Sequence, residues 1–309
     1  MAGRRTRSIA SREMTAANGV AGVRAVVTGS TRGLGLAIAK RLSAGGAHVV
    51  VNGTDTDRCR SVAEDLGAIG VGGRVEADGV ADALVDTCVA EFGGIDVVVN
   101  NAGMTRDAML TRMSRGDLRD VLAAHVEGTW AVSQAAVRAM KSGGTGGAIV
   151  NVTSGTALFG NPGQSNYAAA KGAILGMTRA LSLELARFGI DVNAVAPTVK
   201  TDMTASLAKS LADEDAELGT VFGEPESVAL LFGYLCSPAS RGMTGQILSF
   251  DGGQLSVWSH PRPASSFDPS GTSWDITDFE SALGNPSVWE PLHPDRLGRL
   301  LQGQRAGAR

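Results

Sequence analysis

Short, almost uniformly apolar runs alternate along this chain with longer segments that place apolar residues at helical spacing. Strands without a polar face are typical of a parallel sheet that helices cover on both sides. The alternation therefore predicts a doubly wound α/β fold with about seven parallel strands and ligand sites at their carboxyl ends. The predicted strands are Arg24–Val27, His48–Asn52, Gly72–Glu76, Ile95–Asn100, Ala148–Thr153, Ile190–Ala196 and Gln246–Phe250. The clearest helical segments are Asp82–Phe92, Asp117–Met140, Tyr167–Phe188 and Glu226–Leu235.

The composition divides the chain into a body and two appendages. Residues 1–23 are basic and contain one acidic residue, Glu13, which predicts a disordered extension, with an organelle transit peptide as the alternative. Residues 24–254 carry the strand and helix pattern and predict a single domain. Residues 255–309 form a C-terminal tail that holds three of the four tryptophans, Trp258, Trp274 and Trp289.

The tail contains two candidate helices. Ser273 is a candidate N-cap for a helix whose Ile276, Phe279 and Leu283 share one face and which ends at Gly284. A second helix is predicted at Asp295–Gln302. Two hypotheses for the tail stay open. The tail packs against the body of its own subunit or of a neighbouring subunit, or it extends as a mobile appendage.

Charge and cysteine content exclude several classes of function. With 28 basic and 31 acidic residues the net charge is −3, which gives no global attraction for nucleic acid or anionic lipid. No apolar run approaches the roughly 20 residues that a membrane span needs. Three separated cysteines, Cys59, Cys88 and Cys236, indicate neither a disulfide framework nor a metal site. A cytoplasmic protein is the prediction.

A glycine-rich turn follows the first predicted strand and precedes a helix. Glycines there let the backbone approach a pyrophosphate, whose charge is stabilised by the free N–H groups at the helix start. This turn predicts a Rossmann-type dinucleotide site, although its glycine spacing differs from the usual fingerprint. Its residues run Thr28, Gly29, Ser30, Thr31, Arg32, Gly33, Leu34 and Gly35.

Four further motifs follow in order along the body. They are Asn100-Asn101-Ala102-Gly103, Ser154, Tyr167 with Lys171, and Asn193-Ala194-Val195-Ala196-Pro197. With these motifs the chain resembles the short-chain dehydrogenase/reductases over residues 24–254. Within that family Asn100–Asp107 and Gly163–Lys171 look most like the 3-oxoacyl-(acyl-carrier-protein) reductases. The family resemblance implies an NAD(P)-dependent enzyme that assembles as a homodimer or homotetramer.

Tyr167 and Lys171 are four residues apart on a predicted helix, so their side chains share one face. A neighbouring ammonium favours the phenolate and is expected to lower the pKa of the tyrosine from its ordinary value near 10. Tyr167 is therefore the candidate proton donor to a carbonyl or acceptor from an alcohol. Ser154, at the end of the adjacent strand, is placed to hydrogen-bond the substrate oxygen.

The resemblance implies further cofactor contacts. Lys171 would bind the nicotinamide ribose, Asn100 would hold the backbone near the central strand and the adenine ribose, and Asp78 would meet the adenine amine. The predicted cofactor residues are Thr28, Gly29, Ser30, Arg32, Gly33, Leu34, Gly35, Thr54, Asp78, Gly79, Asn100, Ala102, Gly103, Tyr167, Lys171, Pro197 and Thr201.

His125 occupies the place where family members carry an asparagine that holds a water beside the lysine. Related hydroxyacyl-CoA dehydrogenase modules look similar at this place. Two hypotheses stay open for this histidine, a structural role in the core and a part in the proton relay, which the ordinary pKa of histidine would permit.

Cofactor choice is decided at the end of the second strand, where an acid would select NAD. Gly53 stands at that position, while Arg32 and Thr54 are placed to bind a 2′-phosphate. NADP(H) is therefore favoured, although Asp55 follows closely.

The predicted substrate is a small carbonyl compound or alcohol, with an acyl thioester as one possibility. Family members that use carrier proteins have a basic patch at the loop before the fifth strand and at the end of the Tyr167 helix. This chain has Ser142–Gly147 and Phe188 there, with Lys141 as the nearby cation. So weak a positive charge disfavours docking of an acidic carrier protein. The leading hypothesis is a 3-oxoacyl-type reductase or its reverse. The alternative is a catalytically weak nucleotide-binding scaffold.

Overall fold

The computed structural model describes residues 18–201, 204 and 222–284, in two units that divide between Val257 and Trp258. The first unit is built on one eight-stranded sheet in the order β3-β2-β1-β4-β5-β6-β7-β8. Its strands are β1 (Arg24–Val27), β2 (His48–Gly53), β3 (Ile69–Gly72), β4 (Val97–Asn100), β5 (Gly147–Val152), β6 (Ile190–Pro197), β7 (Ile247–Phe250) and β8 (Leu255–Trp258). The first seven strands are parallel. The short connection after β7 makes β8 antiparallel to it.

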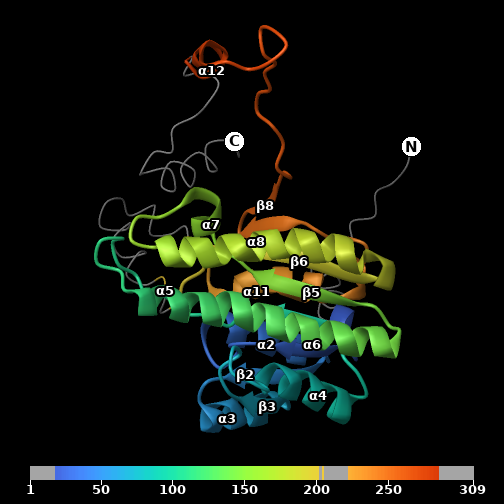
Figure 1. The fold of residues 1–309 in the computed structure, drawn as a ribbon. Coiled ribbons are helices and arrows are strands. Elements are labelled where there is room, and N and C mark those ends of the chain that lie inside the picture. Colours follow the sequence, from blue (N-terminus) through green and yellow to red (C-terminus); the bar gives the residue numbers. More distant parts are fainter. Residues whose placement is uncertain (1–17, 202–203, 205–221, 285–309) are drawn as a thin grey trace, which may run out of the picture. The chain divides into compact units, whose positions relative to one another are not determined.

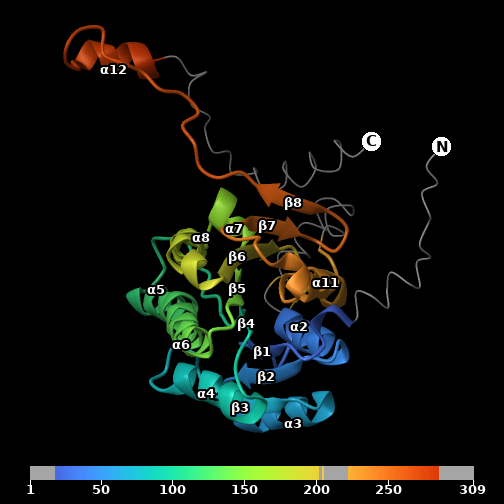
Figure 2. The ribbon, with the colours of Figure 1, turned by 90° about the vertical axis from the view of Figure 1, so that its right-hand side faces the viewer.

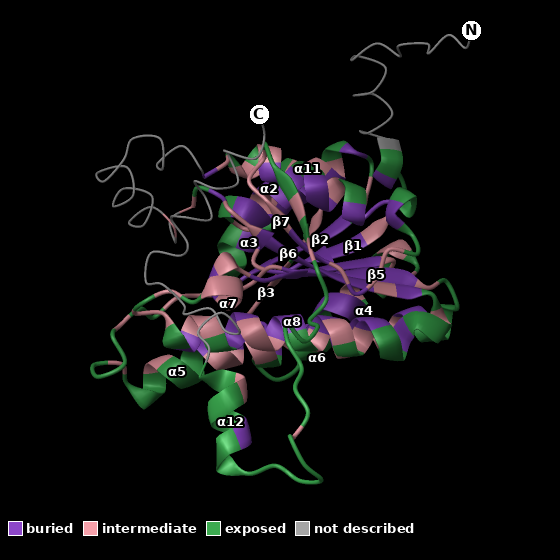
Figure 3. Ribbon diagram, turned by 90° about the horizontal axis from the view of Figure 1, so that it is seen from above, coloured by how far each residue is buried: buried purple, intermediate pink, exposed green. Residues whose placement is uncertain are grey.

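Helices cover both faces of this sheet, as Figure 2 shows with the strands between two helical layers. One apolar cluster packs α2 and α11 against the sheet, and the other packs α4, α6 and the end of α8 against the opposite face. The strands form the buried centre, while the outer faces of the helices are exposed (Figure 3). The helices of the first unit are α2 (Gly33–Ala44), α3 (Thr56–Leu66), α4 (Val80–Phe92), α5 (Arg115–Leu122), α6 (Gly128–Gly143), α7 (Gly155–Phe159), α8 (Ser165–Leu185) and α11 (Pro225–Leu235).

The predicted fold class is confirmed, because the structure is a Rossmann-like, mostly parallel sheet between helical layers. β1 has the predicted bounds, and β8 adds a strand at the start of the predicted tail. The predicted long helix 117–140 is divided by a π-helical turn at Ala123–Glu127, between α5 and α6 (Figure 1). A π turn re-aims the side chains that it carries and is frequent at functional sites.

The third strand was misplaced in the prediction, which put it at residues 72–76. It runs from Ile69 to Gly72, so the prediction was three residues late. Gly70 and Gly72 weaken the strand pattern, yet both are needed because α3 lies against them. A Cβ on Gly70 would come within 2.7 Å of the Cys59 carbonyl oxygen.

The predicted boundaries at both ends of the domain also change. A 3₁₀ turn spans Asn18–Val20, and Val20 is buried in the core, so residues 18–23 do not belong to a disordered extension. In the second unit, α12 (Ile276–Leu283) confirms the predicted tail helix, but its N-cap is Asp275 rather than Ser273. The carboxylate of Asp275 accepts hydrogen bonds from the Thr277 and Asp278 amides, which a serine two residues earlier cannot reach. The predicted helix 295–302 lies outside the described residues.

Within the part of the chain that the structure describes, none of the helices is both long and apolar enough to span a bilayer.

The packing of α11 on α2 predicts a large stability effect at Phe232, which is fully buried between them. We expect Phe232→Ala to lower the free energy of unfolding by about 3–5 kcal/mol, because it removes apolar contacts and leaves a cavity. Denaturant titration measures this change. Leu230→Ala is the matched control on the exposed side of the same helix, with an expected change of about 0.5 kcal/mol or less. Equal losses in the two variants would contradict this packing.

Candidate active site

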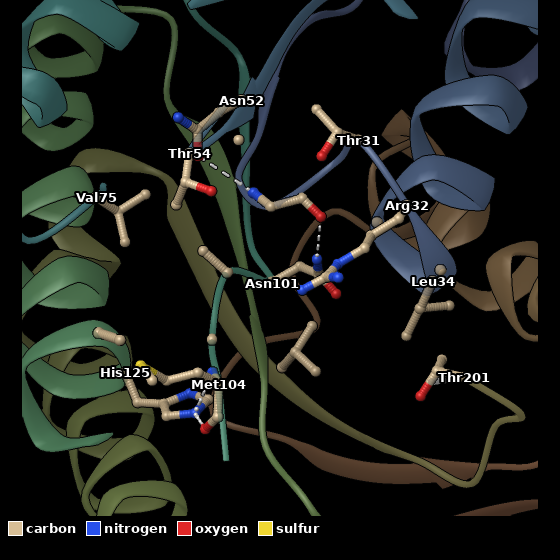
Figure 4. A pocket seen from close by; sticks show the side chains of 18 of the residues that line it. Thr31, Arg32, Leu34, Asn52, Thr54, Val75, Asn101, Met104, His125 and Thr201 are labelled. Atoms are coloured by element: carbon tan, nitrogen blue, oxygen red, sulfur yellow. Dashed lines mark hydrogen bonds between the residues drawn. The ribbon is translucent and has the colours of Figure 1, made fainter. Parts of the chain in front are cut away.

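A cleft of about 710 Å³ opens at the carboxyl ends of the parallel strands. Figure 4 shows side chains from several elements directed into it, with Arg32 and Thr201 on one wall and His125 and Met104 on the other. Open α/β sheets bind ligands at this edge, where the strand order reverses between β1 and β4.

The glycine turn forms one end of the cleft. Gly29 and Gly33 have φ of +61° and +54°, which glycine adopts without the steric cost that other residues pay. A Cβ on Gly29 would come within 2.7 Å of Ala102 Cα, so the turn packs directly on the segment after β4. Arg32 occupies the N-cap of α2 without a side-chain capping bond, which leaves the first amide groups of that helix free to bind an anion.

The buried Thr28 and the partly exposed Asn101 hold this turn in place. The hydroxyl of Thr28 accepts hydrogen bonds from the amides of Asn101 and Ala102, each at 3.0 Å. The Asn101 side chain in turn donates to the carbonyl oxygens of Thr28 and Gly29, each also at 3.0 Å. Thr28 therefore supports the turn without lining the cleft. Asn101, which the sequence prediction missed, does line it.

The place expected to distinguish NAD from NADP carries no acid in the structure. A Cβ on Gly53 would come within 2.7 Å of the Thr31 side chain, so a larger residue there requires Thr31 to move. Arg32 and Thr54 both line the cleft near this place. Among the described residues, Arg32 has no carboxylate within ion-pair distance.

The prediction that Asp78 lies at the adenine end is not what the structure shows. Asp78 is exposed and does not line the cleft, and Gly79 serves as the N-cap of α4. The residues that line this part are Gly73, Arg74, Val75 and Glu76. The cause is the misplaced third strand, because its carboxyl end comes at Gly72 and the chain enters the cleft directly afterwards.

Asn100 lies near the central strands, as predicted, but does not line the cleft. Its side chain is 4% exposed and donates hydrogen bonds to Ser133 and to the Asn151 side chain, each at 2.9 Å. Alternate residues of a strand point to opposite faces, so Asn100 turns into the core while its neighbour Asn101 reaches the cleft.

Ser154, Tyr167 and Lys171 come together on one wall of the cleft. Ser154 follows β5 and caps α7, accepting a hydrogen bond from the Thr156 amide at 3.2 Å. Tyr167 and Lys171 lie on α8, with the ammonium 5.6 Å from the tyrosine ring centre. The Lys171 Nζ donates to the Val152 carbonyl oxygen at 2.7 Å, which fixes it beneath the tyrosine.

Burial dominates the ionisation of this wall. It raises the pKa of Tyr167 to about 12, against the lowering effect of the hydrogen bond with Ser154. Burial also lowers the pKa of Lys171 to about 7, because the ammonium loses its hydration. The predicted lowering of the tyrosine pKa is therefore wrong in direction for this structure, and the phenol keeps its proton at neutral pH.

His125 sits in the π-helical turn and is 1% exposed. Its Nε2 lies 3.1 Å from the Met104 amide nitrogen and 2.8 Å from the Met104 carbonyl oxygen, so its hydrogen-bonding role depends on the tautomer. The ring meets Tyr167 edge-on, with centres 5.2 Å apart. It also fills the space that a Cβ on Gly103 would need.

Burial, aided by the positive charge of Lys171, lowers the pKa of His125 to about 3. A relay through the imidazolium is therefore costly at neutral pH.

The structure brings most of the predicted site residues to one cleft. Those that line it are Gly29, Arg32, Gly33, Leu34, Gly35, Thr54, Ala102, Gly103, His125, Ser154, Tyr167, Lys171, Pro197 and Thr201. Thr28, Ser30, Asp78, Gly79 and Asn100 do not line it. The prediction missed Thr31, Asn52, Gly53, Gly73, Arg74, Val75, Glu76, Asn101, Met104, Ala124, Val152, Thr153, Val199, Lys200 and Thr204. Most of these lie in the last residues of a strand or within a few residues after it, which is the signal that marks them.

Comparison with known proteins agrees with the family resemblance that the sequence motifs indicate. Residues 29–254 match the family described as enoyl-(acyl carrier protein) reductase. The 3-oxoacyl-(acyl-carrier-protein) reductase FabG of Chlamydia muridarum is 41% identical over 240 residues, which are 74% of this chain and 96% of that protein. The chain belongs to the short-chain dehydrogenase/reductases. It is therefore an oxidoreductase that uses a nicotinamide dinucleotide.

The alignments with two further relatives extend beyond residues 24–254 of this chain. The hydroxyacyl-CoA dehydrogenase ChsB1 of Mycobacterium tuberculosis is 36% identical over 296 residues, which are 90% of this chain and 92% of that protein. A crystal structure of a short-chain dehydrogenase from Mycobacterium avium has a TM-score of 0.77 and 32% identity, covering 89% of this chain and 98% of that one. Alignments of this extent must include part of the segment after Gln254, whereas that with the Chlamydia reductase covers about the length of the body alone.

The buried state of His125 predicts a pH effect on stability. The pKa of the folded protein is about 3 against an ordinary value of 6.5, so stability is lost as pH falls from 6.5 towards 3, where the unfolded chain alone takes up the proton. His125→Asn removes the group whose protonation in the unfolded chain causes this loss. We expect the fall in unfolding free energy from pH 7 to pH 5 to be about 2 kcal/mol smaller in the variant.

Urea titration at both pH values measures this difference. His48→Asn, which replaces an exposed histidine on β2, is the control and is expected to follow the wild type. An identical fall in the wild type and His125→Asn would show that His125 does not titrate as its burial requires.

Proposed function

We propose that this enzyme uses NADP(H) to interconvert a 3-oxoacyl thioester and its 3-hydroxyacyl form, with Tyr167 as the general acid and base. The observation that carries the proposal is the convergence of Ser154, Tyr167 and Lys171 on one wall of a cleft whose other end is the glycine turn. The chain's similarity to both a 3-oxoacyl reductase and a hydroxyacyl-CoA dehydrogenase supports the thioester.

The residues present fit a dinucleotide. The free amides at the start of α2 and the close approach of the glycine turn to Ala102 suit a pyrophosphate. When bound, the nicotinamide supplies or accepts the hydride. Ser154 and Tyr167 would both hydrogen-bond the substrate oxygen, and the protonated Tyr167 hydroxyl would donate its proton as that oxygen gains charge. Lys171, held by the Val152 carbonyl, would stabilise the phenolate that results.

NADP(H) is favoured over NAD(H) by the charges around Gly53. Arg32 faces the cleft without a carboxylate partner among the described residues. Asp55, the acid that follows, caps α3 by accepting a hydrogen bond from the Arg58 amide at 3.0 Å. A 2′-phosphate would therefore meet a free guanidinium and the Thr54 hydroxyl.

The site expected for an acidic carrier protein does not adjoin the cleft of this chain. Lys141 and Arg187 lie over the Phe188 ring, with their charged groups 4.2 and 4.6 Å from its centre. These residues precede β5 and β6, so they lie at the amino ends of the strands, opposite the cleft. Arg187 is a second cation there, which the sequence prediction overlooked.

We also propose a cytoplasmic homo-oligomer, either a dimer or a tetramer. Trp130 on α6 and Leu183 on α8 are 53% and 82% exposed, which favours a partner surface over free solvent. All three cysteines are buried as free thiols, which fits a reducing compartment.

Replacing the proposed acid tests the mechanism. We expect Tyr167→Phe to lower kcat/KM for 3-oxoacyl thioesters by about 10²–10⁴-fold, because the proton donor is lost while the ring remains. Binding of NADPH, measured by fluorescence titration, should change little. Full activity in the variant would exclude Tyr167 as the acid. NADPH binding by the wild type without turnover of any carbonyl compound would instead support a nucleotide-binding scaffold.

Cofactor selectivity is tested by direct binding. We expect the wild type to bind NADPH more tightly than NADH, and Arg32→Ala to weaken NADPH binding by about tenfold with little effect on NADH, since a charge-assisted hydrogen bond contributes about 1.5–3 kcal/mol. Arg60→Ala, on α3 with its guanidinium paired to Asp57, is the control. A preference of the wild type for NADH would overturn the assignment.

A further inference from the structure

A cationic surface lies beside the catalytic wall, on the loop after β4 and on α5. We call it the arginine patch and define it by Arg106, Arg112, Arg115 and Arg119, which are all exposed. Among the described residues, none of the four has a carboxylate within 4.0 Å. Figure 1 shows α5 beside the start of α8. The proposed chemistry uses no residue of this surface.

Hydrogen bonds fix the patch to the segment that precedes Tyr167. The Asn166 side chain donates to the Arg106 carbonyl oxygen at 2.8 Å, and the Ala108 amide donates to the Gly163 carbonyl oxygen at 2.9 Å. Asn166 is the residue immediately before the proposed acid. The backbone at the Arg106 end of the patch is therefore fixed relative to Tyr167.

Two aspartates of this segment are hydrogen-bonded within the protein, and the hydrogen bonds with Ser114, with a smaller contribution from the Arg106 charge, lower the pKa of Asp117. Asp107 accepts a hydrogen bond from the Gln164 side chain at 2.8 Å. Asp117 accepts bonds from the amide and hydroxyl of Ser114 in a capping box at the start of α5. Both carboxylates are thus used within the protein, and Asp120 is exposed farther along the helix.

Apolar and cationic residues follow one another along the segment that leaves the cleft at Met104. Met104 lines the cleft beside His125, and Met109 and Leu110 come next with 56% and 77% of their surface exposed. Arg112 follows, and then Arg115 and Arg119, which share a face of α5 because they are four residues apart. An exposed segment with both apolar and cationic side chains suits a ligand that has an uncharged arm and a terminal group of several phosphates.

We propose that the arginine patch binds the phosphates of a coenzyme A thioester, with the pantetheine arm passing over Met109 and Leu110 to the cleft. The inference rests on the proposed thioester function and names its substrate class. Guanidinium groups bind phosphate through two parallel hydrogen bonds, so several exposed arginines on one short segment suit a compact polyphosphate. That a relative over 90% of the chain is named a hydroxyacyl-CoA dehydrogenase agrees with this choice.

Kinetics with two thioesters of the same acyl group test the proposal on the complete, NADPH-saturated enzyme. Arg115→Ala/Arg119→Ala should lower kcat/KM for the 3-oxoacyl-CoA by about tenfold, mainly through KM, since each exposed charge pair contributes up to about fivefold. The N-acetylcysteamine thioester lacks the nucleotide and should be used equally well by the wild type and the variant. High salt should reduce the difference for the CoA thioester. Arg138→Ala on α6 is the matched control, with neither substrate affected.

The outcomes separate the patch from the reaction. Equal changes with both thioesters, or no change with either, would overturn the proposed binding of phosphates by the patch and would leave the proposed function intact. A loss confined to a carrier-protein thioester would show that the patch docks a protein and would also overturn the proposal. If the enzyme uses no thioester, calorimetry with free CoA and 3′-dephospho-CoA still decides the matter. Binding that weakens in the double variant and without the 3′-phosphate supports the patch, and absence of CoA binding to the wild type refutes it.

Discussion

The close contact between the turn after β1 and the segment after β4 is the constraint on which the rest of the cleft depends. Gly29 lies against Ala102 so tightly that no side chain fits between them, and Asn101 ties the two segments together through the Thr28 and Gly29 carbonyl oxygens. Because β1 and β4 are neighbours where the strand order reverses, this seam joins the two halves of the cleft. A shift here would move the dinucleotide turn relative to the catalytic wall.

The same seam positions the catalytic wall through a second close contact. Beyond Ala102 the chain passes over the His125 ring, which leaves room at position 103 for glycine alone. His125 in turn holds the Met104 backbone and meets Tyr167 edge-on. The π-helical turn at Ala123–Glu127 brings the ring to this place. A residue that the sequence marks as a departure from its family is thus a packing centre of this site, and its burial keeps it neutral.

Burial also sets the electrostatics of the site. It opposes the charge on Lys171 and on a Tyr167 phenolate alike, which leaves a protonated tyrosine over a lysine of lowered pKa. Away from this wall, Arg32 at the other end of the cleft and the arginine patch have no carboxylate within ion-pair distance among the described residues. A desolvated reaction site with cationic groups on either side suits substrates and cofactors whose charges lie in their phosphates and whose reacting groups are uncharged.

The sequence by itself determined the layered α/β fold, the position of the glycine turn and the shared helix face of Tyr167 and Lys171, because these depend on local periodicity and on spacing within one element. Ser154 lies on a different element, and the family resemblance is what grouped it with them. It did not place β3, whose glycines are explained by α3 lying on them, and so it assigned the adenine end to Asp78. Whether Asn100 or Asn101 faces the cleft depends on strand orientation within the sheet. The direction of the Tyr167 pKa shift and the neutrality of His125 depend on how much water each group loses. Tertiary structure alone decides these features, because they arise from residues distant in sequence that exclude solvent from one another.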